Sequence, residues 1–227
     1  MYYAREGPKK FLGGTFEVES HAELEKVVAN HKDRVTSNGI EEMKSAPGGG
    51  YIVSITDPEG FPLNFIYGQT PATQKAMPEK LLFNDESTKP RQRQFQRFQP
   101  GPAAVHKLGH FGLVSSQFPD LKKWYTENFN IVPSDLLYID LPSGERKEVA
   151  LFAHLDRGQD LVDHHTIFLS TLTPDSTIPE PHVHHCSFEV HDFDTQALGH
   201  QWLAEKGYKN VWGVGRHILG SQIFDYW

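Results

Sequence analysis

The stretch HKLGHFGLVSSQFPDLKKWYTENF, residues 106–129, joins a strand pattern to a helix pattern. Its first nine positions are strand-like, with Phe111 and Leu113 on one face and His110, Gly112 and Val114 on the other, and residues 118–129 are helix-like. The following segments 135–141, 147–155 and 164–172 are strand-like. This part of the chain therefore predicts a strand, a helix and three further strands.

The same order recurs on both sides of this stretch. Residues 184–192 are strand-like, residues 194–207 are helix-like and residues 221–227 are strand-like. Near the N-terminus, FLGGTFEV, SHAELEKVVANHK and the two strands of GGGYIVSITDPEGFPLNFIYG repeat the pattern, and Ser20 with Glu23 fits a helix capping box. Such recurrence indicates a tandem array of one supersecondary unit. We predict an α+β protein built from tandem βαβββ modules.

The segment 76–103 has a different composition, rich in Lys, Arg, Gln and Pro, and shows no sustained apolar period. These features are typical of a linker or a strap across the surface. The predicted organisation is a non-catalytic N-terminal module in residues 1–75, the linker in 76–103, and a metal-binding catalytic domain of two modules in 104–227.

The composition limits the classes of partner. The 227-residue chain has a formal net charge of −7 and one cysteine. An acidic chain lacks the overall positive field that attracts nucleic acid or an anionic membrane, and the short basic stretch at 91–97 does not reverse this balance. One cysteine cannot form an intrachain disulfide, and the first residues contain no apolar segment long enough for a signal peptide. We expect a cytoplasmic protein that acts on a small molecule.

Histidines are the chemical feature that needs explanation, because the chain has 13 of them and several cluster. In HHCSFEV, residues 184–190, alternation puts His185 on one strand face with Ser187 and Glu189. Cys186 points to the opposite face, where we expect it to be a small core residue. In HKLGHFGLV, His110 shares a face with Gly112, which leaves space beside it.

His110 and His185 thus occupy equivalent first strands of sister modules, and we expect them to meet across one curved sheet. Two imidazoles with a carboxylate form the facial arrangement typical of non-haem Fe(II). A competing pattern is the cupin-like set His182, His184 and Glu189, which needs a bulge to bring its side chains to one face. A third alternative is a small-molecule-binding protein that has lost its metal.

Four blocks of the sequence resemble a known family: LGHFGLV, DHHTIFLS, HHCSFEV and GRHILGSQIFDYW. They are similar to the ordered blocks of type I extradiol ring-cleaving dioxygenases, the catechol 2,3-dioxygenase or dihydroxybiphenyl dioxygenase group of the vicinal oxygen chelate (glyoxalase/bleomycin resistance) superfamily. The resemblance covers most of residues 104–227 and, more loosely, 10–75. It implies modules that form open, cup-like β-barrels, a homo-oligomer, Fe(II) or Mn(II), and O2-dependent cleavage of a catechol-type diol.

The resemblance also assigns roles by motif. His110 and His185 correspond to the two histidine ligands of the metal, and His165 to an active-site acid or base that can move a proton at neutral pH. His217 and Tyr226 correspond to the residues that contact the substrate hydroxyls. We expect His165, His217 and Tyr226 to line the same cavity as the two ligands.

The family's third ligand is a glutamate on the strand after the tyrosine, and the given sequence stops at Trp227. The resemblance therefore implies a chain without the first module, without the last strand and with impaired activity. Asp225 or the terminal carboxylate of Trp227 is an alternative ligand, but Asp225 alternates away from Tyr226 along the strand.

Overall fold

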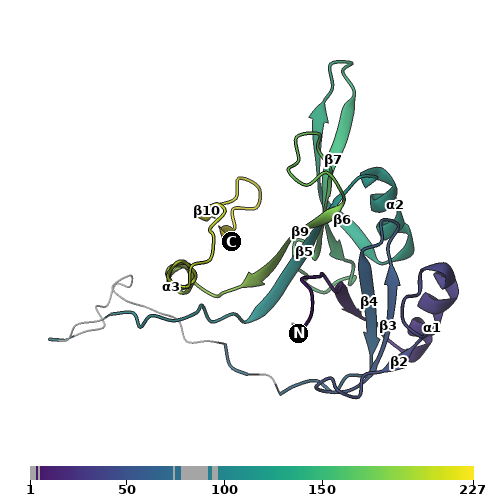
Figure 1. The fold of residues 1–227 in the computed structure, drawn as a ribbon, viewed down its shortest axis with the longest axis horizontal. Coiled ribbons are helices and arrows are strands. Elements are labelled where there is room, and N and C mark those ends of the chain that lie inside the picture. Colours follow the sequence, from purple (N-terminus) through teal and green to yellow (C-terminus); the bar gives the residue numbers. More distant parts are fainter. Residues whose placement is uncertain (1–3, 5, 74, 78–91, 94–96) are drawn as a thin grey trace. The chain divides into compact units, whose positions relative to one another are not determined.

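The computed structural model describes residues 4, 6–73, 75–77, 92–93 and 97–227. Most of the predicted linker, including Arg91 and Phe95 of its basic stretch, lies outside the described residues. The chain divides into two compact units (Figure 1), the first containing Met1–Gln74 and His110–Ser187 and the second containing Lys75–Gly109 and Phe188–Trp227. That the functional domains are separated at residues 75 and 103 stays a prediction.

The first module follows the predicted order. It contains β1 (Gly14–Glu17), α1 (His21–Asn30), the 3-10 turn η1 (Lys32–Arg34), β2 (Glu41–Glu42), β3 (Tyr51–Thr56) and β4 (Pro62–Tyr67). Its sheet has the order β1-β4-β3-β2, with β1 parallel to β4 and the other pairs antiparallel. The Ser20 half of the predicted capping box is confirmed, because the Ser20 hydroxyl accepts a hydrogen bond from the Glu23 backbone N–H, while Glu23 Oε1 accepts one from Lys26.

The second module repeats this topology. It contains β5 (Lys107–Ser115), α2 (Phe118–Asn128), β6 (Ile131–Asp140), β7 (Arg146–Leu155) and β8 (Ile167–Thr171). The strand β9 (His182–Glu189) joins the free side of β5, which gives the five-stranded order β6-β7-β8-β5-β9. As β1 pairs with β4, so β5 runs parallel to β8. The predicted α+β fold of tandem βαβββ modules is confirmed.

The second unit contains the elements that follow β9, namely α3 (Phe193–Glu205), β10 (Gly213–Arg216) and β11 (Ile223–Tyr226). Asp192 caps α3 by accepting a hydrogen bond from the Thr195 N–H, and the helix packs on an antiparallel β10–β11 pair. The strand β10 was not expected from the sequence. No helix among the described residues has the length and apolar character needed to span a bilayer.

One hydrophobic core joins the two modules of the first unit. α1 packs on β3 and β4, and α2 packs on β6, β7 and β8. Leu113 of β5 is fully buried and Phe111 packs against the same core, so this face of β5 points toward the helices as expected. The prediction that Cys186 is a core residue is wrong, because its side chain is exposed. The packing of α2 on β6, β7 and β8 leaves the Cys186 face of β9 uncovered at the edge of the sheet.

The turn between β3 and β4 docks the first module on the start of α2. Glu59 Oε1 accepts hydrogen bonds from the Ser116 N–H at 2.7 Å, the Ser116 hydroxyl at 2.5 Å and the Gln117 N–H at 3.2 Å. Gln117, the N-terminal capping position of α2, makes no side-chain capping bond of its own. A carboxylate from one module therefore binds polar groups at the helix start of the other, a favourable position for negative charge.

Replacing Glu59 with alanine is expected to lower the free energy of unfolding by about 1–3 kcal/mol, because three donors lose a charged acceptor. Glu59→Gln keeps an amide oxygen there and is expected to lose less. Urea unfolding at pH 7 measures both values. Equal stability of the wild-type and Glu59→Ala proteins would show that the turn does not contribute to docking.

Candidate metal centre

His110 and His185 meet on adjacent strands of the first unit. The Nε2 atoms of the two rings are 2.7 Å apart, although 75 residues separate the two positions in the sequence. Two metal–nitrogen bonds of about 2.0–2.1 Å at a right angle place their nitrogens about 3 Å apart. The expected convergence of the two rings is observed, and its geometry fits two neighbouring ligands of one ion.

Polar side chains of β9 hold both rings from the Nδ1 side. Ser187 Oγ lies 2.9 Å from Nδ1 of His110 and also accepts a hydrogen bond from the His110 backbone N–H at 2.7 Å. His184 Nδ1 lies 2.7 Å from His185 Nδ1. Burial lowers the pKa of His184, with a smaller contribution from His182. Lowering this pKa favours a neutral His184 ring beside His185.

Gly112 provides the space that His185 occupies. A Cβ atom added at this glycine would lie 3.1 Å from Nδ1 and Cε1 of the His185 ring and 2.9 Å from Cδ1 of Phe168. These separations are shorter than ordinary van der Waals contact, so the side chains would have to move. The prediction that Gly112 leaves space beside the histidines is confirmed.

Gly112→Ala is expected to displace the His185 ring and to weaken binding of a divalent metal by about tenfold or more, in the range found when groups that orient a metal ligand are removed. Gly101→Ala is the control, because a Cβ there meets no atom within 4 Å. Isothermal titration of both variants measures the effect. An unchanged affinity in Gly112→Ala would contradict the placement of His185 in the metal centre.

His165 lies against this pair, just before β8. Its ring centroid is 4.0 Å from that of His110, and its Nδ1 lies 3.1 Å from Nδ1 of His164. His164 Nε2 in turn lies 2.9 Å from Oδ2 of Asp135 on β6. The structure thus brings together His110, His165 and His185. The contact of His164 with Asp135 had no signal in the sequence, because it depends on how the segment before β8 lies along β6.

His217 and Tyr226 also meet, within the second unit. The Tyr226 hydroxyl lies 3.5 Å from His217 Nε2, and the Phe224 ring packs against His217 with centroids 4.4 Å apart. Burial raises the pKa of Tyr226. These residues therefore form one aromatic and polar cluster, made by β11 and the residue that follows β10. That this cluster and His165 line a single cavity stays a prediction.

Asp225, considered as a substitute ligand, has other partners. Its carboxylate lies 3.0 Å from His200 Nδ1 and accepts a hydrogen bond from the Trp227 indole at 2.7 Å. Its side chain is 9% exposed. The carboxylate therefore connects α3 to β11 and to the residue that follows it, all within the second unit.

Within the described ranges, no group of three or more His, Cys, Asp or Glu side chains is arranged to hold a metal ion. Neither His110 and His185 with a third such side chain nor the cupin-like set His182, His184 and Glu189 forms a group of that kind among the described residues. His182 Nδ1 instead lies 2.7 Å from the Glu180 carbonyl oxygen. Of the three side chains that a facial site needs, the described residues bring two histidines together.

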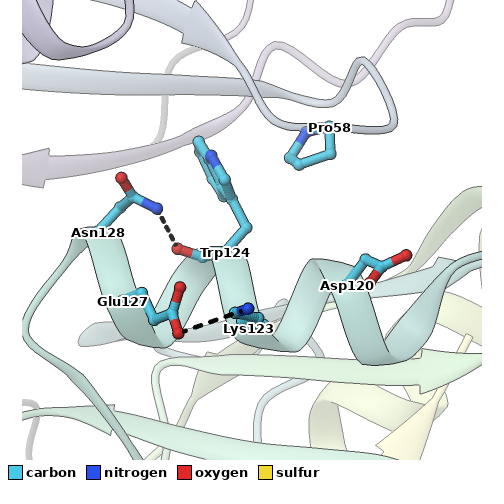
Figure 2. A pocket seen from close by; sticks show the side chains of 6 residues that line it. All are labelled: Pro58, Asp120, Lys123, Trp124, Glu127 and Asn128. Atoms are coloured by element: carbon cyan, nitrogen blue, oxygen red, sulfur yellow. Dashed lines mark hydrogen bonds and ion pairs between the residues drawn. The ribbon is translucent and has the colours of Figure 1, made fainter.

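A shallow pocket of about 270 Å³ lies on the helix side of the first unit. Pro58 of the β3–β4 turn and five residues of α2 line it: Asp120, Lys123, Trp124, Glu127 and Asn128 (Figure 2). Lys123 pairs with Glu127 in its wall, and the Asn128 amide donates to the Trp124 carbonyl oxygen. None of the predicted site residues lines this pocket, so it gives no information on the histidine cluster.

Comparison with known proteins finds similar chains among dioxygenases and a glyoxalase, although no protein-family model matches the chain. Metapyrocatechase 2 from Cupriavidus necator is 32% identical over 84 residues, which are 37% of this chain and 23% of that protein. The 2,3-dioxygenase LapB from Pseudomonas sp. KL28 superimposes with a TM-score of 0.63 at 17% identity, covering 94% of this chain and 67% of that chain.

Two further solved structures have similar scores. The Mn(II)-bound glyoxalase from Novosphingobium aromaticivorans has a TM-score of 0.61 at 20% identity, covering 92% of this chain and 56% of that chain. An extradiol ring-cleaving dioxygenase from B. fuscum has a TM-score of 0.61 at 19% identity, covering 93% of this chain and 50% of that chain. The chain spans only part of each relative, and at these identities the structural likeness establishes the fold. The chain therefore has the fold that these ring-cleaving dioxygenases and the glyoxalase share.

Proposed function

We propose that His110 and His185 hold a divalent Fe(II) or Mn(II) ion at which a catechol-type diol undergoes O2-dependent extradiol cleavage. The observation that carries this proposal is the 2.7 Å separation of the two Nε2 atoms on neighbouring strands. Imidazole is a suitable ligand for iron, and two imidazoles on one side leave coordination positions for substrate and O2. The dioxygenase relatives support the same reaction class.

Each of the other predicted site residues has a role that its chemistry explains. When bound, the metal would hold the diol oxygens and allow electron transfer between the ring and O2. His165, packed against His110, is placed to take a proton from the diol and to return one later. Burial raises the pKa of Tyr226, so its hydroxyl stays protonated at neutral pH and can donate to a substrate oxygen, together with His217.

Two neutral imidazoles alone leave the charge of the ion uncompensated, and no group of three or more His, Cys, Asp or Glu side chains is arranged to hold a metal among the described residues. We therefore propose that the 227-residue chain retains iron weakly after dialysis and turns over slowly. A small carboxylate such as acetate is expected to raise the metal affinity by completing the ligand set. The identity of the metal, the ring substituents of the diol and assembly into a homo-oligomer belong to the same proposal.

The test is anaerobic loading with Fe(II) or Mn(II), addition of catechol and then admission of O2. Formation of the ring-opened product, followed by its yellow absorbance, is expected to require the metal and to be faster with acetate. His165→Ala is expected to lower the rate without lowering metal content. Metal and catechol binding without any product, with or without acetate, would instead support a non-catalytic binding protein of the vicinal oxygen chelate superfamily.

A further inference from the structure

We propose that Ser187 is a positioning residue that holds His110 in the tautomer able to bind a metal. This inference rests on the proposed metal centre and deepens it. One hydroxyl group contacts His110 twice: Ser187 Oγ lies 2.7 Å from the His110 backbone nitrogen and 2.9 Å from the ring Nδ1. The serine follows His185 by two positions on β9, so both side chains lie on the same strand face.

The donors and acceptors of this hydroxyl group are compatible with such a role. A serine hydroxyl has one hydrogen and two acceptor lone pairs, and the His110 backbone N–H, which can only donate, uses one lone pair. A neutral imidazole that binds a metal through Nε2 carries its proton on Nδ1 and needs an acceptor there. Ser187 Oγ lies 2.9 Å from Nδ1, so its second lone pair can accept that proton while the first accepts from the backbone.

The opposite arrangement explains why this contact matters. If the proton were on Nε2 of His110, it would point toward His185 Nε2, which is 2.7 Å away, and no lone pair would be left for the ion. An acceptor at Nδ1 favours the other tautomer and orients the ring. Because the same oxygen also holds the backbone of β5, it couples the ring orientation of His110 to the strand that carries His185.

The test compares Ser187→Ala and Ser187→Thr with the wild-type chain, using Zn(II) as a diamagnetic probe. Zn(II) affinity by calorimetry is expected to fall by about 10–100-fold in Ser187→Ala, as for other groups that orient a metal-bound histidine, and to recover in Ser187→Thr, which keeps the hydroxyl. Cys186→Ala is the matched control, since this neighbouring side chain is exposed on the opposite strand face. Its Zn(II) affinity is expected to equal that of the wild type.

A second readout separates positioning from general support of the fold. In ¹⁵N NMR spectra of the Zn(II)-loaded wild type, the His110 ring proton is expected on Nδ1 and protected from exchange with water. In Ser187→Ala, this proton is expected to exchange faster while the backbone spectrum stays that of a folded protein. If Ser187→Ala does not fold, Ser187→Cys, whose thiol is a weaker acceptor, is expected to show the same loss.

The outcomes distinguish the two proposals. Zn(II) binding by the wild type with unchanged affinity and an unchanged His110 Nδ1 proton in Ser187→Ala would overturn the role of Ser187 alone. A wild-type chain that binds no Zn(II) through His110 and His185 would overturn the proposed metal centre and, with it, this inference.

Discussion

Replacing His185 with alanine is expected to lower the affinity for Fe(II) or Mn(II) by more than about a hundredfold, beyond the effect of removing an outer-sphere group. The reason is that the proposed centre uses two histidines, whose Nε2 atoms lie 2.7 Å apart, so the variant would keep one neutral imidazole. Anaerobic titration at pH 7 measures the loss. His110→Ala is expected to have an effect of the same size, because the two rings have equivalent places on β5 and β9.

His182→Ala is the matched control on the same strand. Its ring nitrogen lies near the Glu180 carbonyl oxygen, and we expect wild-type metal affinity. This control also separates the cupin-like alternative, for which His182 is a ligand and His185 is not. If His182→Ala lost metal affinity and His185→Ala kept it, the metal ligands would have to be assigned to that alternative set.

Between pH 3.5 and pH 7.5, the free energy of unfolding of the wild-type chain is expected to fall by about 3 kcal/mol more than that of Asp57→Asn. Asp57 is 1% exposed, and burial raises the pKa of its carboxyl group from 3.8 to about 6. Hydrogen bonds from the Phe61 and Glu59 amides and from the Tyr125 hydroxyl oppose this rise. The net effect is a carboxyl group that is harder to ionise in the folded protein than in the unfolded chain.

The direction follows from proton binding. Because the pKa of Asp57 is higher in the folded state, the folded protein binds more protons between pH 3.8 and about 6. The contribution of the Asp57 carboxyl group to stability is complete below pH 3.8, falls as the pH rises, and is lost above about pH 6. Urea unfolding across this range measures the difference, with exposed Asp33→Asn as control. A difference between wild type and Asp57→Asn that does not change with pH would contradict the account of this buried carboxyl group.

The repeating order of elements was predictable because strand alternation and helical spacing are local properties. The equivalence of His110 and His185 followed from the same periodicity, since each lies in the first strand of a module, and the order β8-β5-β9 brings those strands together. The cap at Ser20 was predictable for the same local reason. Gly112 was informative because a missing Cβ has a steric meaning that does not depend on the partner strand.

Other features depend on contacts that a single sequence does not encode locally. Ser187 was placed on the His185 face, but its contact with His110 depends on how β5 and β9 are aligned. Cys186 has the pattern of a core residue, yet its exposure depends on how far α2 extends across the sheet. Glu59 reaches α2 through the docking of two modules. The sequence-based prediction therefore failed where the outcome depends on tertiary neighbours.

The most direct test of the metal centre is X-ray absorption spectroscopy of the Fe(II)-loaded chain, in which the outer atoms of imidazole rings produce a countable scattering shell. Two imidazoles are expected in the wild type, one in His110→Ala and one in His185→Ala, and still two in His182→Ala. The same number of imidazoles in the wild type and in both single variants would contradict the assignment of His110 and His185 as ligands of one ion.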